Sequence, residues 1–331
     1  MNSERKTIAK SILGSVIIAI LIFVLLISFA PDSTPYSVNN YGWNGLHEVG
    51  ARFAISSASS FSDVPVSNRT ALLLIDPSVQ ISSSSAAFLQ YFVSSGGTLI
   101  IAGGSRFVNP VLTDLGAHIQ IQDSTISDPL YNWKSPNFPI GLVVPSAARE
   151  FSFLENVTGV ALTNPSPLSL SSGSAVALAN SSPLSVSTNE NHTAHGPFVL
   201  IAAEKVGGGL VIVFGDPNFL TNSVWANGDN QALFTNLFGK SSVYLDTSHW
   251  PANTATSLKA HFVDLYDQFS SGVYRYFLSL GFIALGVILT TTFTDVLTVR
   301  ARKAEPGAST LNNEILSRVR RDREKYGVKT E

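Results

Sequence analysis

The sequence contains no cysteine among its 331 residues. Disulfide bonds, thiolate metal sites and cysteine nucleophiles are therefore excluded. Charged residues are also scarce, at 13% of the chain, against about 25% in an average soluble domain. The six histidines lack the spacing of a zinc motif such as His-Glu-x-x-His, and no Walker loop or Gly-x-Gly-x-x-Gly follows an expected strand. We therefore predict no metal and no cofactor.

Two long runs lack charge altogether. Ser11 to Ala30 and Tyr276 to Thr294 each have about the length that crosses a bilayer as a helix. Lysines and arginines lie just outside both runs, so the positive-inside rule predicts that both termini are cytoplasmic. A cleaved signal peptide is the alternative for the first run, because Ser28-Phe29-Ala30 offers small residues to a signal peptidase.

These runs predict a two-span protein of the plasma membrane, with the lipid bilayer as a partner. The segment between them has 9 basic and 16 acidic residues, which suits an extracytoplasmic domain. The predicted parts are a cytoplasmic N-terminus, a membrane helix, an extracytoplasmic α/β domain, a helical stalk, a second membrane helix and a basic cytoplasmic tail, at residues 1–10, 11–30, 31–250, 251–273, 274–297 and 298–331.

The same intervening segment contains four glycosylation sequons of the form Asn-x-Ser/Thr, at Asn68, Asn156, Asn180 and Asn191. Glycosylated sites would fit an exported surface. Chance is the alternative, because serine, threonine and asparagine are abundant here.

The segment from Ala71 to Phe107 has the pattern of a strand, a helix and a second strand. Ala71 to Ile75 and Thr98 to Ala102 are short apolar runs, typical of strands buried on both faces. Between them, Ser82 to Ser85 can cap a helix, and Gly96-Gly97 can end it. Two strands joined through such a helix are most simply parallel, with a right-handed crossover.

Later segments extend this pattern. Residues 198–203 and 209–215 are apolar runs separated by Gly207-Gly208, which predicts an antiparallel hairpin. Residues 229–238 have helical periodicity, and residues 243–245 return as a strand. The short apolar runs between Gly141 and Ser187 are typical of edge strands and loops. Together these elements indicate an α/β domain.

Several short pieces of this domain follow one another in the order Gly45-Leu46, Gly96 to Ala102, Asp128-Pro129, Pro136 to Pro139, Gly215 to Asn222, Asp229-Asn230 and Asn236-Leu237. Taken together, they resemble an archaeal membrane family catalogued as domain of unknown function 4350. The likeness covers roughly residues 36 to 250. It implies a flavodoxin-like, class I glutamine-amidotransferase-like three-layer sandwich with a mostly parallel sheet, between two membrane helices, and no established activity.

Two catalytic arrangements are conceivable at the ends of the expected strands. Ser105 follows a strand, as the nucleophile does in amidotransferase-like folds, and would need His249 or His47 as its base. The alternative is that Gly104-Ser105 only begins a helix. Four further side chains could form an oxygen-rich metal site, or else cap helices and set turns: Asp76, Asp216, Asp246 and His249.

We therefore predict a binding or scaffold protein in a cell-envelope assembly, without catalytic residues, and an envelope hydrolase acting at the same strand ends as the alternative. The expected partners are envelope proteins or surface glycans, and not nucleic acid. In an open parallel sheet, ligands bind beyond the carboxyl ends of the strands. The predicted ligand-binding residues are Asp76, Gly104, Ser105, Asp216 and Asn218, with Trp133 from a proline-rich loop beside them.

Overall fold

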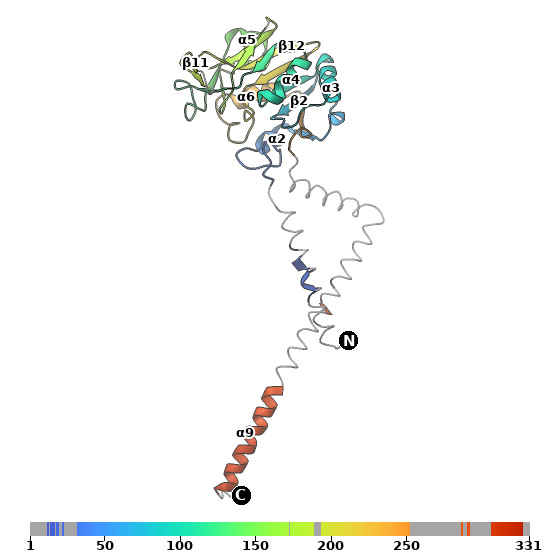
Figure 1. The fold of residues 1–331 in the computed structure, drawn as a ribbon, viewed down its shortest axis with the longest axis vertical. Helices are drawn as coiled ribbons and strands as arrows, with labels where there is room; N and C mark the ends of the chain where they lie inside the picture. Colours follow the sequence, from blue (N-terminus) through green and yellow to red (C-terminus); the bar gives the residue numbers. More distant parts are fainter. Residues whose placement is uncertain are drawn as a thin grey trace. The chain divides into compact units, whose positions relative to one another are not determined.

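The computed structural model describes residues 32–171, 173–188, 193–251 and 306–326, with a few more residues between 12 and 22 and between 286 and 291. The chain divides into two units. One is Pro31–Asn253, and the other combines Met1–Ala30 with Thr254–Glu331. Helix α9 (Pro306–Lys325) belongs to the second unit. The remaining described elements belong to the Pro31–Asn253 unit (Figure 1).

A mixed sheet of 11 strands forms the centre of this unit. Its main path has the order β1-β14-β2-β3-β13-β12-β9-β6-β7. Two strands lie off this path: β8 pairs with β12, and β4 pairs with β8. The strands are β1 (Ser56–Ala58), β2 (Thr70–Ile75), β3 (Thr98–Ala102), β4 (Ile119–Ile121), β6 (Ile140–Val143), β7 (Gly159–Ala161), β8 (Leu168–Leu170), β9 (Ala175–Asn180), β12 (Val199–Val206), β13 (Gly209–Phe214) and β14 (Ser242–Asp246). A second sheet has three strands, β5 (Thr125–Ser127), β10 (Val186–Thr188) and β11 (Thr193–His195).

The predicted strand, helix and strand are confirmed. β2 and β3 pair in parallel, and α3 (Ser83–Ser94) connects them. Ser82 caps α3, since its hydroxyl accepts a hydrogen bond from the Ser85 amide at 3.2 Å. Gly96 lies just after the end of the helix and has φ +104°, a value that favours glycine. Local sequence signals thus determine the segment from β2 to β3.

The predicted hairpin is confirmed as well. β12 and β13 pair antiparallel from Ile201–Phe214 to Val206–Gly209. The turn consists of Gly207 and Gly208, and Gly207 has φ +59°. Because β13 also pairs in parallel with β3, this hairpin is where the sheet changes from parallel to antiparallel pairing.

Two hydrophobic clusters lie on opposite faces of the sheet, since neighbouring side chains along β2 alternate between them. Ala71, Leu73 and Ile75 belong to the first cluster, and Leu72 and Leu74 to the second. The first cluster also takes buried residues from α2 (His47–Phe53), α5 (Pro145–Glu150), the 3-10 turn η2 (Ser152–Leu154) and α6 (Asn230–Phe238). The second takes them from the 3-10 turn η1 (Phe61–Asp63), α3 and α4 (Ser105–Asp114).

The predicted three-layer sandwich with a mostly parallel sheet is wrong. The large sheet is mixed, with four parallel pairings and six antiparallel ones. The reason is the segment from Gly141 to Ser187, which we read as edge strands and loops. Its short strands pair outward from β12 and extend the sheet antiparallel, and helices are few.

The two predicted membrane helices, and the two-span plasma-membrane topology built on them, are also corrected. Among the residues that the structure describes, no helix is long and apolar enough to cross a membrane. Most of residues 11–30 and 274–297, and residues 252–273 of the stalk, lie outside the described residues. An uncharged run of sufficient length does not establish a span by itself, because the whole run must also form a helix.

Candidate functional site

Four neighbouring parallel strands end at the same edge of the large sheet, which we call the strand-end edge. It consists of the residues that follow β14, β2, β3 and β13. Asp246 ends β14, Asp76 follows β2, Gly103-Gly104 follows β3 and Asp216 lies just after β13. This edge is where ligands bind in open sheets with parallel strands.

Asp216 is the most enclosed of the predicted site residues, with 0% of its surface exposed. Its carboxylate accepts hydrogen bonds from the Thr163 amide at 2.5 Å, the Asn218 amide at 2.8 Å and the Asn218 side chain at 3.1 Å. Burial raises the pKa of Asp216 to about 6, although these hydrogen bonds favour the charged form. Asp216 therefore joins the segment after β7 to the loop after β13, and it has a structural role.

Tyr36 lies close to this network, although sequence reasoning did not select it. Its hydroxyl donates to Asn218 Oδ1 at 3.3 Å. Burial raises the pKa of Tyr36 above its ordinary value, and the negative charges of Asp76 and Asp216 add to this effect. Tyr36 thus brings a neutral phenol to the strand-end edge.

Asp76 differs from Asp216 because its side chain is exposed. Its amide donates to the Ala102 carbonyl at 2.7 Å, but no hydrogen bond of its carboxyl group occurs within the described residues. The loops around it still desolvate the carboxyl enough to raise its pKa. Asp76 has φ +46° and Tyr36 has φ +61°, which is left-handed backbone that non-glycine residues rarely adopt. Such strain tends to gather at functional sites.

The loop after β3 is close to Asp76 and opens toward solvent at its end. A Cβ atom on Gly103 would lie 3.1 Å from the Cα atom of Asp76. A Cβ atom on Gly104 would have no neighbour within 4 Å. Gly104 is the N-cap of α4, and Ser105 is its first residue.

The structure does not assemble a catalytic centre around Ser105. His249 Nδ1 pairs with Asp246, and His47 Nδ1 lies 3.3 Å from the Val38 carbonyl. Neither histidine is hydrogen-bonded to Ser105 in the part of the chain that the structure describes.

Trp133 packs against its own domain and is half-buried. Its indole nitrogen donates to the Leu162 carbonyl at 3.0 Å, and its ring meets Phe138 edge-on at 5.2 Å. Leu162 precedes Thr163, which binds Asp216. The Trp133 loop is therefore connected to the strand-end edge through residues 162 and 163.

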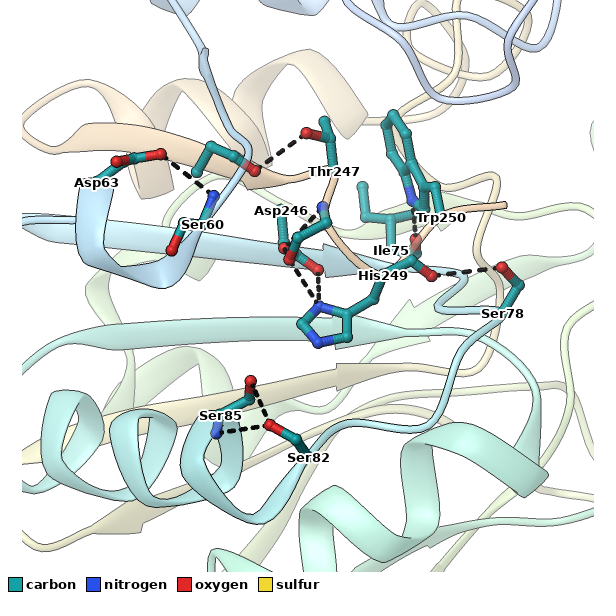
Figure 2. Close-up of polar contacts among 12 residues, drawn as sticks. Ser60, Asp63, Ile75, Ser78, Ser82, Ser85, Asp246, Thr247, His249 and Trp250 are labelled. Atoms are coloured by element: carbon teal, nitrogen blue, oxygen red, sulfur yellow. Dashed lines mark hydrogen bonds and ion pairs between the residues drawn. The ribbon is translucent and has the colours of Figure 1, made fainter. Parts of the chain in front are cut away.

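Asp246 and His249 form a second polar group at this edge (Figure 2). Asp246 Oδ2 lies 2.7 Å from His249 Nδ1, and both residues are buried. The segment is fixed to the end of β2 and to the loop after it. Trp250 Nε1 donates to the Ile75 carbonyl at 2.8 Å. The amide and the hydroxyl of Ser78 donate to the His249 carbonyl at 2.9 Å and 3.3 Å.

The four side chains considered for a metal do not come together as a ligand set. The carboxylate of Asp216 already accepts hydrogen bonds from the amides of Thr163 and Asn218 and from the Thr163 hydroxyl. Asp246 pairs with His249. Within residues 32–171, 173–188, 193–251 and the other described segments, no group of three or more histidine, aspartate or glutamate side chains could hold a metal ion.

The four sequons differ in accessibility. Asn68 and Asn156 are exposed, whereas Asn180 is half-buried in β9. Asn180 Oδ1 is fully buried and accepts no hydrogen bond within the described residues, so this side chain would have to turn outward to carry a glycan. Asn191 lies outside the described residues.

Sequence reasoning missed Tyr36 and Thr163 for different reasons. Thr163 follows β7, which is 3 residues long and gives almost no periodic signal. A left-handed tyrosine has no sequence signature, because this conformation is imposed by its surroundings and not by its own preference.

Comparisons with known proteins identify a family. The model of the family described as "Domain of unknown function (DUF4350)" matches residues 35–238. No curated protein matches the chain. Among solved structures, the mmIFT52 N-terminal domain is 16% identical with a TM-score of 0.38, and the match covers 51% of this chain and 75% of that one.

A second solved structure, the cytoplasmic protein STM1381 from Salmonella typhimurium LT2, is 12% identical with a TM-score of 0.35, and the match covers 54% and 76% of the two chains. Both likenesses are too distant to support a statement about fold or function. The family match covers most of the chain, as the sequence motifs predicted. The chain therefore belongs to the family defined by the domain of unknown function DUF4350.

Proposed function

We propose that the Pro31–Asn253 unit is a binding module of a larger assembly, and that its partner occupies the strand-end edge. The partner is another protein or a glycan. The contact surface includes Asp76, Gly104, Ser105 and Asn218, with the Trp133 loop beside them. We also propose an archaeal origin, which rests on the resemblance alone.

The observation that carries this proposal is the state of Asp76. The hydrogen bonds of Asp216 explain that residue as a structural joint, but they leave Asp76 unexplained. An exposed carboxylate on left-handed backbone adds nothing evident to stability. Asp76 lies close to Gly103, just before the open start of α4, and its charge helps to raise the pKa of Tyr36. A partner that donates hydrogen bonds to this carboxylate would explain why the strain is kept.

The test is an affinity purification of the tagged full-length chain from its own cells. Asp76→Asn is the informative variant, because asparagine tolerates the left-handed conformation and keeps the size while removing the charge. Asp123→Asn is the matched control, since Asp123 is an exposed acid in another loop. We expect partners to be lost with Asp76→Asn and kept with Asp123→Asn. Equal recovery from both variants would exclude Asp76 from the contact surface.

The alternative, a hydrolase that uses Ser105, has no comparable observation in its favour. A serine nucleophile needs a base within hydrogen-bond reach, and within the described residues neither His249 nor His47 is hydrogen-bonded to Ser105. Because Ser105 belongs to the proposed contact surface, we expect Ser105→Ala to weaken partner capture.

A further inference from the structure

The carboxylate of Asp76 has no counter-ion in the part of the chain that the structure describes. Burial is the only influence on its pKa, and neither a hydrogen bond nor a neighbouring charge adds to it. Arg106, in the first turn of α4, has its guanidinium 5.3 Å from the centre of the Phe107 ring, and it forms no ion pair with Asp76 within the described residues. The negative charge of Asp76 is therefore available to a ligand.

Two aromatic rings adjoin this carboxylate. Trp250 Nε1 donates to the carbonyl of Ile75, the residue directly before Asp76, at 2.8 Å (Figure 2). The centre of the Tyr36 ring lies 6.4 Å from that of Trp250. Burial raises the pKa of Tyr36 and the charge of Asp76 raises it further, so the phenol and the carboxylate are close enough to interact. Both rings are half-buried, and part of each is therefore open to solvent.

The backbone that carries these groups is held in place before any ligand binds. The Tyr36 amide donates to the Asn44 carbonyl at 2.8 Å, and its hydroxyl donates to Asn218 Oδ1 at 3.3 Å. The Asp76 amide donates to the Ala102 carbonyl at 2.7 Å. A ligand that binds here loses less free energy to the ordering of the protein, because these segments are already ordered.

We propose that Asp76, Tyr36 and Trp250 bind the guanidinium group of an arginine side chain on a partner protein. A guanidinium can donate two parallel hydrogen bonds to a carboxylate, and its flat face stacks on aromatic rings. A lysine ammonium has no such plane, and a neutral sugar hydroxyl would leave the charge of Asp76 uncompensated. Residues 31–253 include 14 acidic and 7 basic residues, which also favours a basic partner. This inference rests on the proposed function and specifies its partner.

The experiment titrates the full-length protein with a tripeptide that has a central arginine and blocked termini. A single exposed ion pair is weak, so binding is followed by NMR of the peptide. Matched peptides contain lysine, or citrulline, the neutral analogue of arginine. We expect saturable binding of the arginine peptide with upfield shifts of its side-chain methylene protons, which report the ring currents of Tyr36 and Trp250. The lysine peptide should bind at least about threefold more weakly, and the citrulline peptide should not saturate.

Asp76→Asn should weaken binding of the arginine peptide at least about fivefold, whereas Asp123→Asn, the matched exposed acid, should leave it within about twofold. Tyr36→Leu should reduce both the affinity and the upfield shifts. If Tyr36→Leu fails to fold, the upfield shifts in the wild type decide.

Three results would overturn the inference: equal binding of the arginine and citrulline peptides, equal binding of the arginine and lysine peptides, or binding that Asp76→Asn leaves unchanged. If the arginine peptide fails to bind but affinity purification still recovers a partner that depends on Asp76, only this inference fails. If no Asp76-dependent partner is recovered either, the proposed function fails with it.

Discussion

The stability of the domain depends on the protonation state of Asp216. Its pKa rises from 3.8 to about 6 on folding, so between about pH 4 and pH 6 the folded state holds a proton that the unfolded state has lost. The free energy of unfolding must then fall as pH rises through this window, by up to about 3 kcal/mol for this residue. Above pH 6, the hydrogen bonds to Asp216 stabilise its charged carboxylate in the folded state.

Urea unfolding of the wild type and of Asp216→Asn, at pH 4 and at pH 7, measures this effect. We expect the variant to lose the part of the pH dependence that comes from Asp216, and to be less stable at both pH values because its amide cannot accept from every donor around it. Glu204 and Asp229 have lowered pKa values and contribute with the opposite sign. The difference between the two proteins removes their contribution, and identical pH dependence would disprove the assignment.

At the scale of elements, the contribution of the α3 cap to the free energy of unfolding can be measured. Ser82→Ala removes the hydroxyl that accepts from the Ser85 amide, and loss of such a cap costs about 1 kcal/mol. Ser84→Ala is the control because Ser84 has no capping role. Thermal unfolding should show a lower melting temperature for Ser82→Ala only. Equal melting temperatures would mean that water replaces the cap.

The packing of the hairpin gives a second prediction at this scale. A Cβ atom on Gly209, at the start of β13, would lie 2.2 Å from the Val93 carbonyl oxygen and 2.3 Å from that of Gly97. Backbone cannot give way as a side chain can, so we expect Gly209→Ala to destabilise the domain by about 3 kcal/mol or more. Gly104→Ala meets open space and should be nearly neutral in the same chemical denaturation. Similar effects of the two changes would contradict this view of the packing.

Elements with strong local signals were predictable from the sequence. β2, α3 and β3 have apolar runs, a serine cap and a glycine stop, and Gly207-Gly208 marks the hairpin. The antiparallel strands beyond β12 were not predictable, because strands such as β7 and β8 have only 3 residues each and owe their pairing to distant partners.

The candidate site was partly predictable for the same reason. Asp76, Gly104 and Asp216 follow recognisable strands, and they reach the same edge because those strands are parallel. Tyr36 and Thr163 reach it from loops whose course depends on tertiary contacts. Trp133 was predicted as a ligand-binding residue from its place in a proline-rich loop, and its hydrogen bond to the Leu162 carbonyl could not be predicted from the sequence.

At the scale of the whole molecule, the Pro31–Asn253 unit has its own core and both of its sheets. We therefore expect a fragment of residues 31–253 to unfold cooperatively by itself, with the same urea midpoint as this domain in the full chain. Circular dichroism and tryptophan fluorescence should report coincident transitions. A broad transition, or a fragment that remains unfolded, would show that the other unit contributes to stability.

The strand order has a consequence for how this domain is made. β14 is the last strand of the sheet in sequence, yet it lies between β1 and β2, two of the earliest. On the ribosome, β1 and β2 must therefore wait until residue 246 has emerged, each with an edge that no strand covers. These two edges can pair incorrectly before β14 is made, either with each other or with the edges of a neighbouring nascent chain. We expect this to be the main route of misfolding for this strand order. Chains that end before β14 should be substrates for chaperones and proteases, however complete the rest of their sheet.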